Sequence, residues 1–106
     1  TQLVRSPALA RLLMEQRIGT MKPEAPVFID ANRHDPLVPW TGANQLGRDW
    51  CALGADVQFW TNEQPPFLNK TVFNHGITMF VEGERAMQWV TDRFNGLPTT
   101  PNCGQF

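Results

Sequence analysis

Apolar residues recur along the chain with two different spacings, which predict where helices and strands lie. Leucines at positions 9, 12 and 13 mark one helical face. Ser6 and Pro7 precede this face and suit the cap and the first position of a helix. Gly19 is expected to end the helix, and residues 20–25 are expected to form a linker.

Two short segments have the pattern of strands. Residues 26–31 contain the consecutive apolar residues Val27, Phe28 and Ile29, which are typical of a strand buried on both faces of a parallel sheet. In residues 56–61, Val57 and Phe59 belong to an alternating pattern. The segment between these strands begins with a loop over residues 32–39, which holds an Asn, an Asp and two prolines.

Two further helices are predicted. Residues 40–53 place apolar side chains at spacings of three and four, and Gly54 follows as the expected end. Residues 62–76 are expected to form a long loop, and residues 80–94 a last helix. Its apolar face consists of Gly83, Met87, Val90 and Phe94, and its solvated face of Glu82, Glu84, Arg85, Asp92 and Arg93.

The order helix, strand, helix, strand, helix predicts an α/β fold with parallel strands and right-handed crossovers. We expect one domain over residues 1–106. It comprises a helix and linker (1–25), a βαβα unit (26–96) and a tail (97–106). Two strands leave at least one sheet edge open unless another segment covers it, so we expect the chain to be the C-terminal part of a longer protein.

Composition and charge exclude several classes of function. The 106 residues are 42% hydrophobic and carry a net charge of −1, so neither a nucleic-acid partner nor a membrane anchor is expected. Cys51 and Cys103 fit one disulfide in an oxidising compartment, with two buried free thiols as the alternative. His34, Asp35 and His75 are too few ligands for a metal site, and no cofactor is expected.

Asp35 and His75 are the residues that could carry chemistry. Each follows one of the two predicted strands, and active sites in parallel sheets gather beyond the carboxyl ends of the strands. A carboxylate that orients an imidazole forms the acid and base of a catalytic triad. Each residue also has a purely structural interpretation: Asp35 as a turn residue before Pro36, and His75 as a loop histidine before Gly76.

Three segments of the sequence resemble known hydrolases. Asp35-Pro36-Leu37-Val38-Pro39 after an apolar strand resembles the acid loop of α/β-hydrolases. Trp50-Cys51-Ala52-Leu53-Gly54-Ala55 and Trp89-Val90-Thr91-Asp92-Arg93-Phe94-Asn95-Gly96 resemble the secretory lipase family, which includes fungal lipases of the A type. The resemblance extends over roughly residues 20–104.

This resemblance implies the C-terminal αβαβα portion of an α/β-hydrolase fold, with two parallel strands flanked by three helices. It implies Asp35 as the triad acid, His75 as the triad base, and a disulfide between Cys51 and Cys103. It also implies secretion, a lipid or ester substrate, and the remainder of a lipase chain as partner. Asp30 is a rival carboxylate, ranked lower because it lies within or at the end of the strand.

The sequence lacks the nucleophile of such a triad. Its only serine is Ser6, which is expected to cap a helix, and Cys51 lies within a predicted helix. We therefore expect the chain to be inactive by itself, with the nucleophile supplied upstream. The alternatives are an α/β-hydrolase of another substrate class, such as a peptidase, and a non-catalytic binding or oligomerisation module.

Overall fold

The computed structural model describes residues 5–66 and 72–106. They form α1 (Pro7–Glu15), β1 (Val27–Asn32), α2 (Trp40–Ala52), β2 (Val57–Asn62), α3 (Val72–Val81) and α4 (Gly83–Phe94). β1 and β2 pair in parallel, with Val27 opposite Val57 and Asn32 opposite Asn62. The predicted parallel pairing is therefore confirmed, whereas the described residues form four helices, not three.

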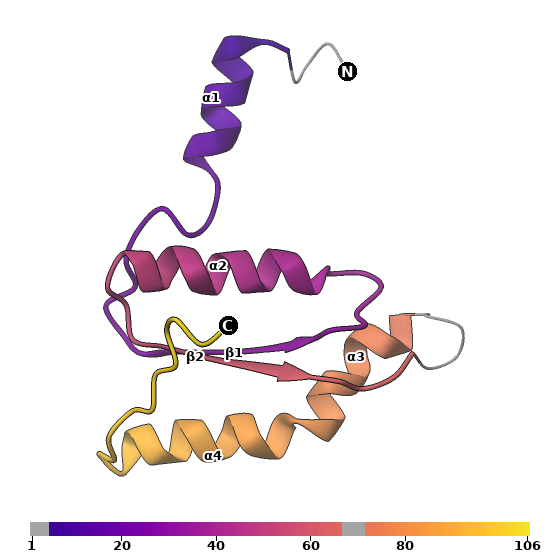
Figure 1. The fold of residues 1–106 in the computed structure, drawn as a ribbon, viewed down its shortest axis with the longest axis vertical. Coiled ribbons are helices and arrows are strands. Elements are labelled where there is room, and N and C mark those ends of the chain that lie inside the picture. Colours follow the sequence, from indigo (N-terminus) through magenta and orange to yellow (C-terminus); the bar gives the residue numbers. More distant parts are fainter. Residues whose placement is uncertain (1–4, 67–71) are drawn as a thin grey trace.

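The two strands lie between α2 on one face and α4 on the other (Figure 1). On the α2 face, Phe59 is buried and packs edge-on against Trp40, with ring centroids 6.1 Å apart. On the α4 face, Phe28 lies against Trp89 at a centroid distance of 5.8 Å. The buried apolar core is small and centres on β2, so aromatic contacts carry much of the packing on both faces.

The C-terminal tail covers the outer edge of β2. The Phe59 N–H donates to Oδ1 of Asn102 at 2.7 Å, and Nδ2 of Asn102 donates to the Phe59 carbonyl at 2.8 Å. The Asn102 N–H donates to the Val57 carbonyl at 3.0 Å. One asparagine thus takes the place of a neighbouring strand along this part of the edge.

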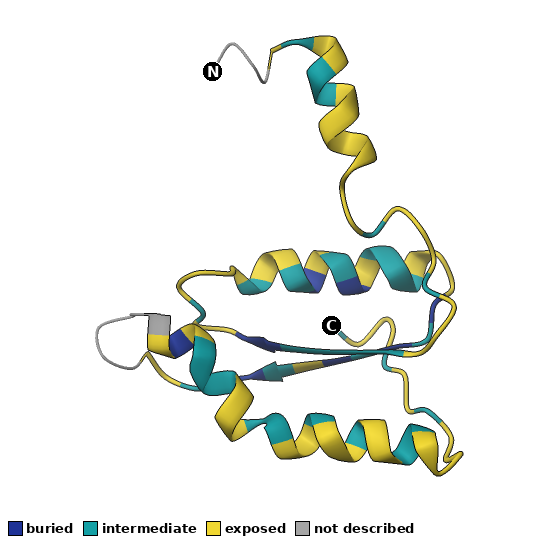
Figure 2. Ribbon diagram, turned by 180° about the vertical axis from the view of Figure 1, so that it is seen from behind, coloured by how far each residue is buried: buried dark blue, intermediate teal, exposed yellow. Residues whose placement is uncertain are grey.

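The first helix stands apart from the sheet in both views, and Figure 2 shows that it is largely exposed. Ser6 caps it as predicted and accepts the Leu9 N–H at 3.5 Å. The prediction that it continues to Gly19 is wrong, because it ends at Glu15. Gly19 has a φ of 94° in the following turn, where a β-carbon would lie 3.1 Å from Leu46 of α2.

The predicted loop over residues 62–76 is wrong in its last part. α3 begins at Val72, so His75 lies in the first turn of a helix. Residues 67–71 of the predicted loop lie outside the described residues. The predicted helix over residues 80–94 is instead the end of α3 followed by α4, and Glu82 separates the two. Gly83 directly after Glu82 is a poor helix-interior residue, which fits a break at this point.

The predicted apolar face of α4 is wrong, whereas Glu84 and Arg85 of the predicted solvated face are exposed as expected. Met87, Val90 and Phe94 are exposed. Arg85 lies over the Trp60 ring at 3.7 Å, and Arg93 lies over the Trp89 ring at 4.8 Å. Flat guanidinium groups stack on indole rings, which explains how Arg85 and Arg93 pack on aromatic side chains beside the sheet. Within the described ranges, no helix has the length and apolar character needed to cross a bilayer.

Candidate active site

Asp35 follows β1 on a tight turn that fixes its carboxylate. The Leu37 and Val38 N–H groups donate to Oδ1 at 2.8 and 3.0 Å. The Asp35 N–H itself donates to the Asn32 carbonyl at 3.2 Å. Asp before Pro36 therefore does form the expected local turn, and this turn leaves Oδ2 for another partner.

That partner is His75 on α3. Its Nδ1 lies 2.7 Å from Oδ2 of Asp35. An ionised carboxylate only accepts hydrogen bonds, so Nδ1 carries the proton in this contact. Nε2 of the neutral ring is then the basic nitrogen, and it has no hydrogen bond within residues 5–66 and 72–106.

The environment of Asp35 favours its ionised form. Burial alone would raise the pKa of Asp35, but the hydrogen bonds from Val38, His75 and Leu37 outweigh it. They hold the pKa of Asp35 below its ordinary value. The Asp35 side chain is 9% exposed and that of His75 is 45% exposed, so the acid is covered while the imidazole faces solvent.

Asp30 does not contact His75 among the described residues. It lies within β1, where its Oδ1 accepts Nδ2 of Asn62 at 2.7 Å. Burial raises the pKa of Asp30, and the hydrogen bond from Asn62 opposes this shift only in part. The structure thus brings Asp35, rather than Asp30, into hydrogen-bond contact with the imidazole.

A cavity of about 240 Å³ opens at this end of the sheet. It is lined by Asp30, Ala31, Asn32, Asp35, Val38, Ala43, His75, Gly76, Thr78 and Met79. Both the acid and the imidazole border this cavity, together with apolar side chains. A second hollow of about 530 Å³, beside α4 and the tail, includes neither Asp35 nor His75.

The residues that could act as a nucleophile lie elsewhere. Ser6 caps α1, and this helix lies away from the carboxyl ends of the strands (Figure 1). Cys51 is bonded to Cys103, with α-carbons 5.7 Å apart, so the disulfide implied by the resemblance is confirmed. Among the described residues, no group of three or more His, Cys, Asp or Glu could hold a metal ion.

Three buried asparagines around this site were missed in the sequence. Asn32 and Asn62 end the two strands, and Asn74 directly precedes His75 on α3. All three are buried. Asparagine at the end of two successive strands was the available signal, but that residue type is also ordinary in turns.

Comparison with known proteins supplies the family context. The sequence profile of the secretory lipases matches residues 1–102. The secreted triacylglycerol lipase LIP2 of Malassezia globosa is 29% identical over 100 residues, covering 92% of this chain and 21% of that protein. The secreted triacylglycerol lipase LIP1 of Malassezia furfur is 30% identical over 81 residues. This match covers 76% of the present chain and 15% of that protein. The chain thus spans about a fifth of the length of these relatives, and no solved structure matches it.

Proposed function

The chain belongs to the secretory lipase family, and from this premise we propose that it supplies the acid and base of a Ser-His-Asp triad. The reaction is hydrolysis of carboxylic esters, and the named activity of the relatives favours acylglycerols. The observation that carries the proposal is the 2.7 Å contact between Nδ1 of His75 and Oδ2 of Asp35. In this proposal the fold is the C-terminal portion of an α/β-hydrolase.

Each residue has a definite part in the reaction. Asp35 holds the imidazole in the tautomer with the proton on Nδ1 and stabilises the imidazolium that forms. Nε2 of His75 takes the proton of the attacking serine hydroxyl as the acyl–enzyme forms, and gives it to the leaving alcohol. In the second half of the cycle, Nε2 takes a proton from the water that attacks the acyl–enzyme. It then returns this proton to the serine oxygen as the acyl–serine bond breaks and the carboxylic acid leaves.

The nucleophile comes from polypeptide outside this chain. Ser6 is the only serine and caps α1, and Cys51 is held in a disulfide. Without a nucleophile, a triad loses nearly all of its covalent contribution to the rate. We therefore expect the 106 residues alone to have little or no esterase activity.

A chimera tests the proposal. Residues 1–106 replace the matching segment of the Malassezia globosa LIP2 lipase, and hydrolysis of p-nitrophenyl butyrate is measured. We expect an active enzyme in which His75→Ala lowers kcat by at least about 10³-fold. Asp35→Asn is expected to lower kcat by about 10⁴-fold, because the imidazole then adopts the wrong tautomer.

His34→Ala is the matched control, because His34 is a second exposed histidine and contacts Glu63 rather than Asp35. It should leave kcat close to that of the parent chimera. A folded, active chimera that keeps its rate in His75→Ala would refute the proposal. A folded chimera that is inactive with His75 and Asp35 both in place would do the same.

A further inference from the structure

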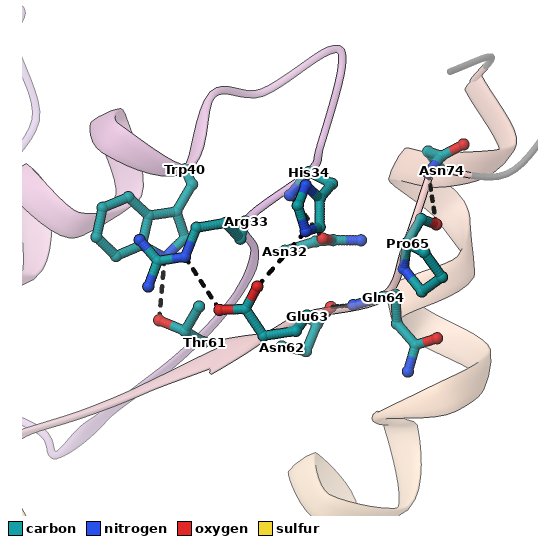
Figure 3. Close-up of polar contacts among 10 residues, drawn as sticks. All are labelled: Asn32, Arg33, His34, Trp40, Thr61, Asn62, Glu63, Gln64, Pro65 and Asn74. Atoms are coloured by element: carbon teal, nitrogen blue, oxygen red, sulfur yellow. Dashed lines mark hydrogen bonds and ion pairs between the residues drawn. The ribbon is translucent and has the colours of Figure 1, made fainter. Parts of the chain in front are cut away.

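The two strands end on a matched pair of buried asparagines. Asn32 and Asn62 are opposite each other in the register and are 2% and 3% exposed. Oδ1 of Asn32 accepts the His34 N–H at 2.8 Å, and Oδ1 of Asn62 accepts the Gln64 N–H at 3.4 Å (Figure 3). The segments that lead to Asp35 and toward His75 therefore leave the sheet through the same kind of turn.

The amide nitrogens of this pair differ. Nδ2 of Asn62 donates to Oδ1 of Asp30 at 2.7 Å and lies 3.4 Å from Oγ1 of Thr78. Nδ2 of Asn32 is buried and has no hydrogen-bond partner among the described residues. The Asn62 carbonyl also accepts the Arg33 N–H at 3.0 Å. Both residues contact the loop after β1, but of this pair the hydrogen bond to α3 belongs to Asn62.

The contact with Thr78 bears on His75. The two residues are three positions apart on α3, so they lie on neighbouring turns of the same helix face. A hydrogen bond that fixes Thr78 against the strand ends also fixes the rotation of α3 about its axis. The His75 side chain is about half exposed, so packing alone holds it only in part. Its orientation toward Asp35 therefore depends on how the helix is held.

We propose that Asn62 is a positioning residue, whose side-chain amide holds α3 at the rotation that places Nδ1 of His75 against Asp35. The inference rests on the proposed function, because the placement matters only if this pair is the acid and base. Asn62 touches neither substrate nor the reacting atoms in this assignment. It acts through Thr78 and through Asp30, to which it donates its shorter hydrogen bond.

Asn62 is a better candidate for holding α3 in place than the neighbouring ion pairs, because its side chain is buried. Glu63 contacts Nε of Arg33 at 3.0 Å and Nε2 of His34 at 3.5 Å (Figure 3). Its side chain is 61% exposed, and exposed ion pairs contribute little. The Asn62 amide is almost fully covered, so its loss leaves buried polar groups without a partner. Oδ2 of Asp30 already has none among the described residues.

The test uses the full 106-residue chain with ¹⁵N-labelled histidine, observed by NMR. A proton shared by an imidazole Nδ1 and a carboxylate resonates far downfield, which reports the His75–Asp35 contact directly. Asn62→Asp keeps Oδ1 for the Gln64 N–H but places a carboxylate oxygen against Asp30. We expect this variant to lose the downfield resonance of His75 while the ring signals of His34 stay unchanged.

Glu63→Gln is the matched control, one residue further along the chain. It weakens the contact with His34, so the ring signals of His34 should shift while the downfield resonance of His75 remains. A double variant that exchanges the two side chains, Asn62→Asp with Asp30→Asn, tests whether the contact can be restored. In this swap the amide at position 30 donates to the carboxylate at position 62. We expect the swap to recover the resonance.

The outcomes separate the two proposals. If the parent chain lacks the downfield resonance, the acid–base pair itself is refuted and this inference falls with it. If the parent and Asn62→Asp both show it, only the role of Asn62 is refuted. If Asn62→Asp is unfolded by circular dichroism, the swap decides: a folded swap with the resonance supports the role, and a folded swap without it overturns the role.

Thr78→Val covers the case in which neither of those variants folds. It removes only the hydroxyl that Asn62 reaches on α3. Several-fold faster solvent exchange of the downfield proton is expected, because α3 then rotates more freely. An unchanged exchange rate in a folded Thr78→Val variant would contradict the proposed path through α3.

Discussion

Asp30 and Asp35 are close in sequence, yet their pKa values are shifted in opposite directions. Burial raises the pKa of Asp30, and Glu82 adds to this shift while Asn62 and Arg85 oppose it. At Asp35 the three hydrogen bonds that its carboxylate accepts more than offset the effect of burial. Burial thus dominates at Asp30, whereas the larger number of hydrogen-bond donors favours the ionised form of Asp35.

Acid pH should test this difference through stability. A carboxyl with a lowered folded-state pKa stabilises the fold above its unfolded-state pKa of about 3.9. That contribution is lost as the pH falls through the lower folded-state value. Asp35→Asn should reduce the free energy of unfolding at neutral pH by about 1 kcal/mol, since its partner His75 is half exposed.

Urea unfolding at neutral and at acid pH measures this effect. The difference between Asp35→Asn and the parent should vanish at the acid end, where both side chains are neutral. Asp92→Asn is the matched control on α4, where the carboxylate accepts Nε2 of Gln88 on an exposed surface. A constant difference across the whole pH range would contradict the assignment of the effect to the Asp35 charge.

The residue pattern predicted that Asp35 and His75 meet, but not which residues hold them in place. Successive parallel strands end at one edge of a sheet, so Asp35 and His75 could be expected to meet there. Asn62 could not be singled out, because its importance lies in contacts with Asp30 and Thr78 that no local spacing reveals. Long-range polar contacts of this kind depend on tertiary structure rather than on periodicity.

Among the elements, the strands and α2 followed their patterns and α3 did not. Consecutive apolar residues marked β1, and helical spacing marked α2, within about one residue of the observed bounds. α3 contains Gly76 and several β-branched residues, which are weak helix formers. It packs against β1 and α4, and this tertiary packing stabilises a helix that local propensity does not favour.

The tail is an element without regular structure that nevertheless stabilises the sheet. Asn102 exchanges two hydrogen bonds with the backbone of Phe59 through its side chain. Asn102→Ala should lower the free energy of unfolding by about 1–3 kcal/mol, because both backbone groups lose their partner. Chemical unfolding of the disulfide-intact chain measures the change.

Asn95→Ala provides the comparison, since Asn95 is an exposed residue that follows α4. The same truncation there should change the free energy of unfolding by less than about 0.5 kcal/mol. Equal effects at the two positions would show that the edge contacts of Asn102 contribute nothing specific.

The whole molecule is more extended than its length requires. The radius of gyration is 16.3 Å, against about 13 Å for a compact domain of this size. α1 projects from the sheet, and many large apolar side chains are exposed, among them Met79, Met87, Val90 and Phe94. Apolar surface of this extent is typical of a region that contacts further polypeptide.

Exposed apolar residues on α4 should therefore be removable without loss of stability. The double substitution Met87→Gln and Phe94→Gln is expected to reduce binding of a hydrophobic dye and self-association. The melting temperature should not fall, because neither side chain is buried. Dye fluorescence, light scattering and thermal unfolding measure the three quantities.

Glu84→Gln, an exposed polar substitution on the same helix, should leave dye binding unchanged. A marked drop of the melting temperature in the double variant would show that this face of α4 is packed in solution. Unchanged dye binding would show that the apolar surface lies elsewhere.

The position of Asn102 directly before Cys103 has a consequence for oxidation. Cys51 and Cys103 are separated by 52 positions in the chain, so they meet rarely in an unfolded ensemble. Once Asn102 docks on the edge of β2, the two thiols face each other at a high effective concentration. Docking of the tail on the sheet edge is thus expected to speed formation of the Cys51–Cys103 bond.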